Sequence, residues 1–100
     1  MIKVCYDITD NEIFLRSTDN DSIIQLSTFV ARELSDFLML CYETNGCPCS
    51  IIAVGGVQLK SDSKTSVVVS DYRLDREFVI SDWQWKSLAV ALNMALLTQR

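Results

Sequence analysis

Apolar and polar residues alternate along the first part of the chain, which is the pattern of half-buried β-strands. Between residues 2 and 8 every second side chain is apolar, and shorter segments of the same kind span 12–17 and 23–26. The connections at 9–12 and 18–21 are rich in Asp and Asn, which adopt turn conformations readily. The pattern therefore predicts three antiparallel strands joined by tight turns.

The periodicity then changes to that of a helix. Ser27 directly precedes a run whose apolar side chains recur at helical spacing: Val30, Leu34, Phe37, Leu38 and Cys41. Serine is a preferred helix N-cap. Ser22 with Gln25 also fits a capping box, but β-branched Ile23 and Ile24 favour a strand, so we predict that the helix begins after Ser27. Asn45-Gly46, followed by Pro48, is a helix stop.

The second half repeats the succession of strands and helix. A long apolar segment at 50–59 predicts a strand, in which Gly55-Gly56 indicates a bulge or a sharp bend. Two further strands are expected at 65–72 and 77–80. Ser81 or Asp82 would cap a final helix that extends to about Thr98.

The two halves are similar at an offset of 54 residues. The offset aligns Ser27 with Ser81, Leu34 with Leu88, Leu38 with Leu92 and Thr44 with Thr98, and it places Phe29 on Trp83. This similarity favours an internal duplication with halves of about 1–46 and 47–100. Two unrelated units built as strand, serine and helix would give the same few identities, so both explanations stay open.

These elements predict an α+β fold in a single domain covering residues 1–100. We expect one antiparallel sheet of about six strands with both helices on one face, in the order βββα-βββα. Two helices do not cover six strands fully. The far face of the sheet should therefore be hydrated or used in binding.

The C-terminal helix is apolar over most of its circumference. One stripe consists of Trp85, Leu88, Ala89, Leu92 and Leu96, and a second row on another side consists of Trp83, Val90, Met94 and Leu97. A helix of this kind is buried on more than one side. Either it is wedged between the sheet and the first helix, or the second row is an interface with another copy of the chain or another protein.

Charge and composition exclude several classes of function. The net charge of −4 argues against nucleic-acid binding, which needs a basic face, and against docking on anionic membranes. No signal-peptide pattern and no long apolar segment is present, so we expect a cytoplasmic protein with reduced cysteines.

No constellation of catalytic residues is recognisable. The chain has no His, which removes the usual general base and the commonest metal ligand. Its carboxylates are concentrated in the predicted turns, where they are normally solvated. No glycine-rich phosphate loop is present either, because Gly55-Gly56 lies within a strand pattern. We therefore expect a protein that is not an enzyme and needs no cofactor.

Four cysteines are enough in number for a tetrahedral zinc site, but their spacing is poor for one. Cys47 and Cys49 are separated only by Pro48, whereas zinc knuckles have two to four intervening residues. Cys41 also belongs to the apolar stripe of the first helix. The expected state is an ordinary thiol for each cysteine, with Cys41, Cys47 and Cys49 as weak candidates for metal binding or redox chemistry.

The leading functional hypothesis is a non-enzymatic protein-interaction module that associates with itself through Trp83, Val90, Met94 and Leu97. Its size and acidity are also those of many inhibitors, immunity proteins and accessory proteins of mobile elements, an analogy of little weight. The alternative is a small-ligand-binding protein. Its cavity would lie between sheet and helices, or between subunits, and would be lined by Tyr6, Phe14, Tyr72 and Trp85.

Overall fold

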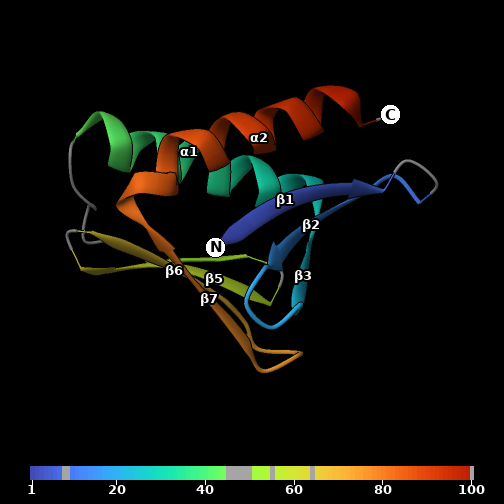
Figure 1. Ribbon diagram of the computed structural model, residues 1–100, viewed down its shortest axis with the longest axis horizontal. Helices are drawn as coiled ribbons and strands as arrows, with labels where there is room; N and C mark the ends of the chain where they lie inside the picture. Colours follow the sequence, from blue (N-terminus) through green and yellow to red (C-terminus); the bar gives the residue numbers. More distant parts are fainter. Residues whose placement is uncertain (8–9, 45–50, 55, 64, 100) are drawn as a thin grey trace.

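The computed structural model describes residues 1–7, 10–44, 51–54, 56–63 and 65–99. The first half contains β1 (Ile2–Asp7), β2 (Glu12–Ser17), β3 (Ile23–Leu26) and α1 (Thr28–Glu43). The second half contains β4 (Ile51–Val54), β5 (Val57–Ser63), β6 (Ser66–Asp71), β7 (Arg76–Ser81), a 3-10 turn η1 (Asp82–Gln84) and α2 (Trp85–Thr98). The two helices form one layer, and the strands lie on one side of it (Figure 1).

The described strands form two antiparallel sheets, so the expected single sheet of six strands is wrong. One sheet has the order β1-β2-β3 and the other the order β4-β5-β6-β7. The additional strand arises because the segment expected to be one strand at 50–59 turns back on itself, with Val54 opposite Val57. Gly56 makes this turn with a φ of 83°, a conformation that glycine adopts without a steric penalty.

A side chain, and not a strand ladder, connects the two sheets near the start of β1. Gln84 is buried, and its Nε2 donates a hydrogen bond to the carbonyl oxygen of Ile2 at 3.0 Å. On the other side of the molecule, Arg76 Nη1 donates to the carbonyl oxygen of Ile23 at 2.6 Å. Both bonds join groups more than fifty residues apart in sequence, which periodicity and turn signals cannot reveal.

The first helix begins as expected, whereas the second begins differently. The N-cap of α1 is Ser27, whose Oγ accepts a hydrogen bond from the Val30 amide at 3.2 Å. Ser81 occupies the corresponding place before η1 but makes no side-chain capping bond. The helical segment therefore starts with a 3-10 turn, and the α-helix itself begins at Trp85.

The core fills the space between the helical layer and the sheets. All five residues of the predicted apolar stripe of α1 are buried. In α2, Trp85, Leu88, Ala89 and Leu92 are buried, and Leu96 packs against the same core. Inward-facing residues of the strands complete it, among them Ile13, Leu15, Ile24, Val67, Val69 and Ile80. Both halves thus contribute to one core.

The order of strands followed by a helix occurs twice, and the correspondence at 54 residues extends to strand register. β2 (Glu12–Ser17) falls on β6 (Ser66–Asp71). Ile13 is paired with Leu26, and the residues 54 positions later, Val67 and Ile80, are also paired. β4 has no counterpart among the described residues of the first half.

The turns at the ends of β2 and β6 have the same construction. Ser17 and Asp71, which are 54 residues apart, are both buried. The Ser17 hydroxyl accepts a hydrogen bond from the Asp19 amide at 3.3 Å, and the Asp71 carboxylate accepts one from the Arg73 amide at 3.0 Å. Each turn then contains an aspartate with positive φ: 62° at Asp21 and 51° at Asp75. Short polar side chains tolerate this left-handed conformation.

The helices are antiparallel and meet at corresponding residues. Ser35 is buried, and its hydroxyl donates a hydrogen bond to the carbonyl oxygen of Ala89 at 3.1 Å. Ala89 lies 54 residues after Ser35, so the two positions correspond. At one end of the pair the Thr28 hydroxyl bonds Gln99 Oε1 at 2.8 Å, and at the other Lys86 lies over Tyr42. A contact between corresponding residues of two antiparallel helices places a local pseudo-twofold axis between them, normal to the helical layer.

Candidate interaction surface

The most distinctive surface of the molecule is the outward side of its last helical segment. Four large apolar residues of η1 and α2 are exposed there, and we call them the outer row: Trp83 (68% exposed), Val90 (47%), Met94 (61%) and Leu97 (82%). Leu88, Ala89 and Leu92 on the other side of α2 pack into the core. The second apolar row predicted from the sequence is therefore in solvent, and α2 is not enclosed by the rest of the chain.

The corresponding positions of α1 are only partly apolar. Phe29 and Leu40, which correspond to Trp83 and Met94, are exposed as well. In contrast, Asp36 and Glu43 occupy the positions that correspond to Val90 and Leu97. Sequence reasoning did not single out Phe29 and Leu40, although the offset that places Phe29 on Trp83 was the signal that could have found them. The outer row is therefore uninterrupted by charge on the last helical segment, whereas two of the four corresponding positions of α1 are acidic.

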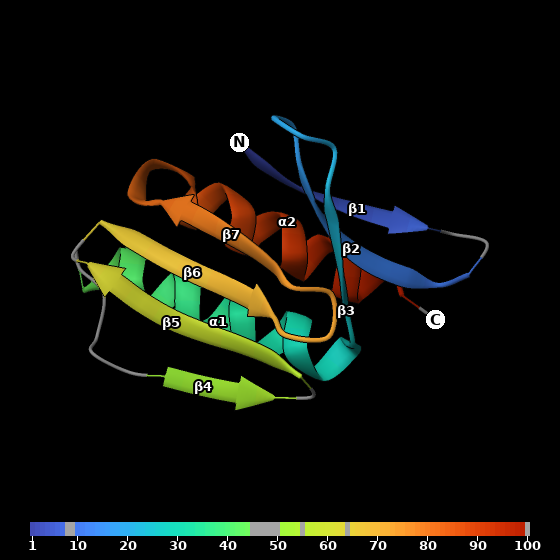
Figure 2. The same cartoon turned by 90° about the horizontal axis from the view of Figure 1, so that it is seen from below.

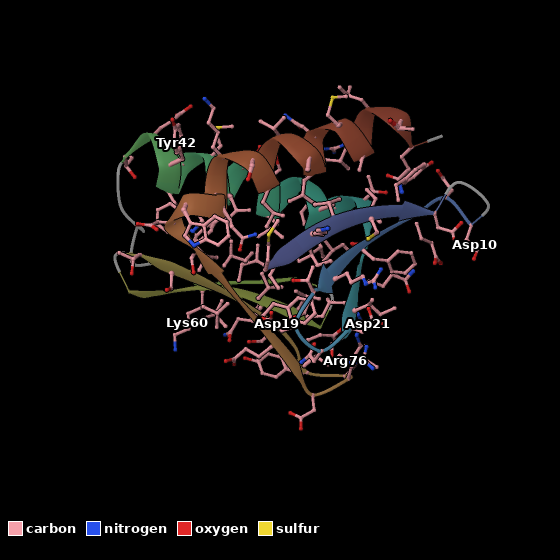
Figure 3. The ribbon with its side chains drawn as sticks, in the orientation of Figure 1. Asp10, Asp19, Asp21, Tyr42, Lys60 and Arg76 are labelled. Carbon is pink, nitrogen blue, oxygen red and sulfur yellow. The ribbon has the colours of Figure 1, made fainter. Side chains whose placement is uncertain are left out.

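A cation–π contact joins α1 and α2 at one end of the helix pair. Lys86 Nζ lies 5.4 Å from the centroid of the Tyr42 ring, near the C-terminal end of α1 (Figure 3). Such contacts at exposed sites contribute about 0.5–1 kcal/mol. The contact holds the Lys86 ammonium over the neighbouring helix. The Lys86 charge therefore lies between α1 and the outer row.

A hollow formed by described residues lies on the second sheet. Its volume is about 400 Å³. Its lining consists mainly of polar residues of β5, β6, β7 and the β6–β7 turn: Gln58, Lys60, Ser70, Asp71, Tyr72, Asp75, Arg76 and Glu77, with Val68 and Val79. Lys60 and Arg76 mark its location on the side of the molecule away from the helices (Figure 3). Its lining contains two cations, Lys60 and Arg76, and three carboxylates, Asp71, Asp75 and Glu77, so it presents both signs of charge.

The pKa of Asp71 lies below its ordinary value. Burial alone would raise the pKa of Asp71, but hydrogen bonds from the Arg73 side chain and amide, with the nearby guanidinium charge, outweigh burial and lower it. The Asp71 carboxylate accepts from Arg73 Nε at 3.3 Å in addition to the amide. Asp71 therefore anchors the turn as an ionised carboxylate.

The structure does not gather the residues predicted to line a ligand cavity. Trp85 lies in the core, where its Nε1 donates to the carbonyl oxygen of Ile80 at 3.1 Å. Tyr72 is exposed and bonds Gln58 through its hydroxyl. Tyr6 packs against the core, and its hydroxyl bonds Asn11. Phe14 of β2 is paired with Cys5, so its side chain lies on the face of the sheet opposite to that of Tyr6. Only Tyr72 borders the hollow on the second sheet.

The candidate thiols are separated as far as the structure describes them. Cys41 is buried in the core and Cys5 is half-buried on β1, whereas Cys47 and Cys49 lie outside the described residues. The described part of the chain contains no group of three or more His, Cys, Asp or Glu side chains arranged to hold a metal ion. The prediction about Cys47 and Cys49 stays open.

Comparisons with known proteins leave the surface as the main guide to function. No protein family, no curated protein and no solved structure matches the chain. Among the described helices, none has the length and apolar character required to cross a membrane.

Proposed function

We propose that the chain is a cytoplasmic, non-enzymatic protein-interaction module that pairs with a second copy of itself through the outer row. The observation that carries the proposal is the exposure of four large apolar side chains on one side of the last helical segment. Aromatic residues and Met are enriched at protein interfaces, and an apolar patch with polar neighbours is the usual mark of one.

Burial energetics support pairing with a second copy. Each square ångström of apolar surface removed from water contributes about 25 cal/mol, and tryptophan is the residue type that most often dominates binding energy. Self-association by twofold symmetry uses the same patch twice, so one exposed row on each chain suffices. The charged residues Asp36 and Glu43 make the corresponding side of α1 a poorer partner for the outer row, because burying them unpaired is costly.

Replacing Trp83 and Met94 with Ser is expected to shift the molar mass in solution from dimer to monomer. The change removes the two largest apolar side chains of the outer row while leaving the buried stripe of α2 intact. Light scattering on a size-exclusion column over a range of concentrations measures the effect.

The matched control is the double variant Leu74→Ser with Val79→Ser. Both residues are about half exposed, but they belong to the β6–β7 turn and β7 and not to the helices. This control should retain the mass of the unmodified protein. A Trp83→Ser, Met94→Ser variant that stays dimeric with an unchanged melting temperature would rule out the outer row as the interface.

The second candidate function is the binding of a small ligand. Its site would differ from the cavity expected from the sequence. The hollow on the second sheet, at about 400 Å³, is in the size range of ligand pockets. Its polar lining would suit a small zwitterion rather than an apolar molecule. A rise in melting temperature with amino acids or other zwitterionic metabolites, lost in Arg76→Gln, is the result that would favour this function.

A further inference from the structure

The outer edge of β1 has backbone groups without partners among the described residues. Thr18 donates its amide to the carbonyl oxygen of Met1 at 2.9 Å, which sets the alternation of the β1–β2 ladder. In this alternation Ile2, Val4 and Tyr6 direct their N–H and C=O groups away from β2. Gln84 bonds the carbonyl of Ile2, but within the described structure the outward backbone groups of Val4 and Tyr6 make no hydrogen bond.

In the second half of the molecule, the corresponding edge is paired with a further strand, β4. Val4 is paired with Leu15 on β2, and Val69, which is 54 residues after Leu15, is paired with Leu59 on β5. Leu59 has a strand on its other side as well, because β4 pairs there with Ile52 opposite Leu59. Among the described strands none takes this place beside β1, which forms an outer edge of the first sheet (Figure 2). Open edges of this kind are sites for strand addition.

We propose that β1 pairs antiparallel with β1 of a second copy, with Cys5 of the two chains facing each other at the twofold axis. This inference rests on the proposed self-association and specifies its geometry. In this register Val4 of each chain lies opposite the partner's Tyr6. A hydrogen-bonded antiparallel pair exchanges both its N–H···O bonds, so the outward backbone groups of Val4 and Tyr6 are satisfied on both chains.

Charge complementarity selects this register. With Cys5 at the centre, Lys3 of each chain faces the partner's Asp7, so two opposite-charge pairs form across the axis. Centring the pair on Val4 instead would place Lys3 opposite the partner's Cys5 and lose both pairs. The Asp7 carboxylate already accepts a bond from the Asp10 amide at 3.2 Å, but a carboxylate has further acceptor positions for the ammonium group.

The same pairing brings Met94, one residue of the outer row, toward the α2 helix of the second copy. α2, and not α1, is the helix that packs directly on β1 (Figures 1 and 2). Ala89 faces α1, and Met94 lies roughly 140° around the helix from Ala89, because an α-helix turns about 100° per residue. Met94 therefore lies on the flank of α2 away from α1. Joining two β1 edges places the two α2 helices beside each other on one continuous six-stranded sheet.

Charge exchange between positions 3 and 7 tests the register. Lys3→Glu puts two acidic pairs across the axis and Asp7→Lys puts two basic pairs there, so each single change should weaken dimerisation about tenfold. The double variant Lys3→Glu, Asp7→Lys restores opposite charges and should recover the affinity of the unmodified protein. Dimer dissociation constants from sedimentation equilibrium measure this, with melting temperatures confirming that each variant is folded.

Cross-linking at Cys5 tests the twofold axis independently. Facing residues of a non-hydrogen-bonded antiparallel pair have Cα atoms about 4.5 Å apart, within the range that a disulfide spans. In a Cys47→Ser, Cys49→Ser background, diamide should take the two electrons and two protons of the facing thiols and leave a disulfide-linked dimer. The same background with Cys5→Ser is the control and should remain monomeric on a non-reducing gel.

The outcomes separate this inference from the proposed function. Recovery of affinity in the double charge variant together with the Cys5-dependent dimer supports β1 pairing. Absence of either result, in a protein whose dimer is dissociated by Trp83→Ser with Met94→Ser, overturns β1 pairing and leaves the outer-row interface in place. An unmodified protein that is monomeric at every concentration overturns both.

Discussion

Leu38→Ala is expected to lower the free energy of unfolding by about 2–5 kcal/mol. The Leu38 side chain is completely buried in the core that α1 shares with the sheets and α2. Its truncation removes apolar contacts and leaves a cavity, because a close-packed interior relaxes only partly around a missing group. Urea denaturation, followed by tryptophan fluorescence and circular dichroism, measures the change.

Leu92→Ala is the matched variant, because Leu92 corresponds to Leu38 at the 54-residue offset and is also completely buried. If the halves form one cooperative unit, both variants lower the denaturation midpoint by similar amounts, with one transition and an unchanged slope. Two separate transitions, or a loss confined to one spectroscopic probe, would show that the halves unfold independently. A loss below about 1 kcal/mol would contradict the tight packing of this core.

Asp71→Ala is expected to lower the free energy of unfolding by about 1–3 kcal/mol. Asp71 is buried, and its carboxylate accepts bonds from the amide and the guanidinium of Arg73. Alanine leaves the amide in the turn without this acceptor. Ser17→Ala, which removes the corresponding bond to the Asp19 amide in the first half, should cost less because a neutral hydroxyl is a weaker acceptor.

The lowered pKa of Asp71 also gives this variant a pH signature. A carboxylate whose pKa is lower in the folded state stabilises the fold above its ordinary pKa, and the stabilisation is lost as pH falls through the folded-state value. The stability difference between the unmodified protein and Asp71→Asn should therefore be largest near neutrality and shrink below about pH 4. A difference that is constant from pH 7 to pH 3 would contradict an ionised Asp71.

Local features of the fold were predictable because their causes lie within a few residues of sequence. The strands at 12–17 and 23–26 have the bounds that alternation predicts, and α1 is capped by Ser27 as expected. The apolar stripe of α1 is buried as its spacing indicates. The offset of 54 residues is confirmed in element order, in the register of β2 with β3 and of β6 with β7, and in the two aspartates with positive φ.

Features that depend on distant residues were not predictable in the same way. The strands form two sheets in place of the single one expected, and the segment expected to be one strand at 50–59 is two strands because the chain reverses at Gly56. Tyr6, Phe14, Tyr72 and Trp85 were grouped by their aromatic character, but strand parity and the core packing of Trp85 separate them.

The sequence by itself determined where most strands and both helices lie and which side chains could be buried, because alternation, helical periodicity and capping act over a few neighbouring residues. It also identified two apolar sides on the last helix. Only the tertiary structure decided which side meets the core, since that depends on how α2 packs against α1 and the sheets. The same packing leaves Trp83, Val90, Met94 and Leu97 in solvent, and it leaves the outer edge of β1 without a neighbour among the described strands.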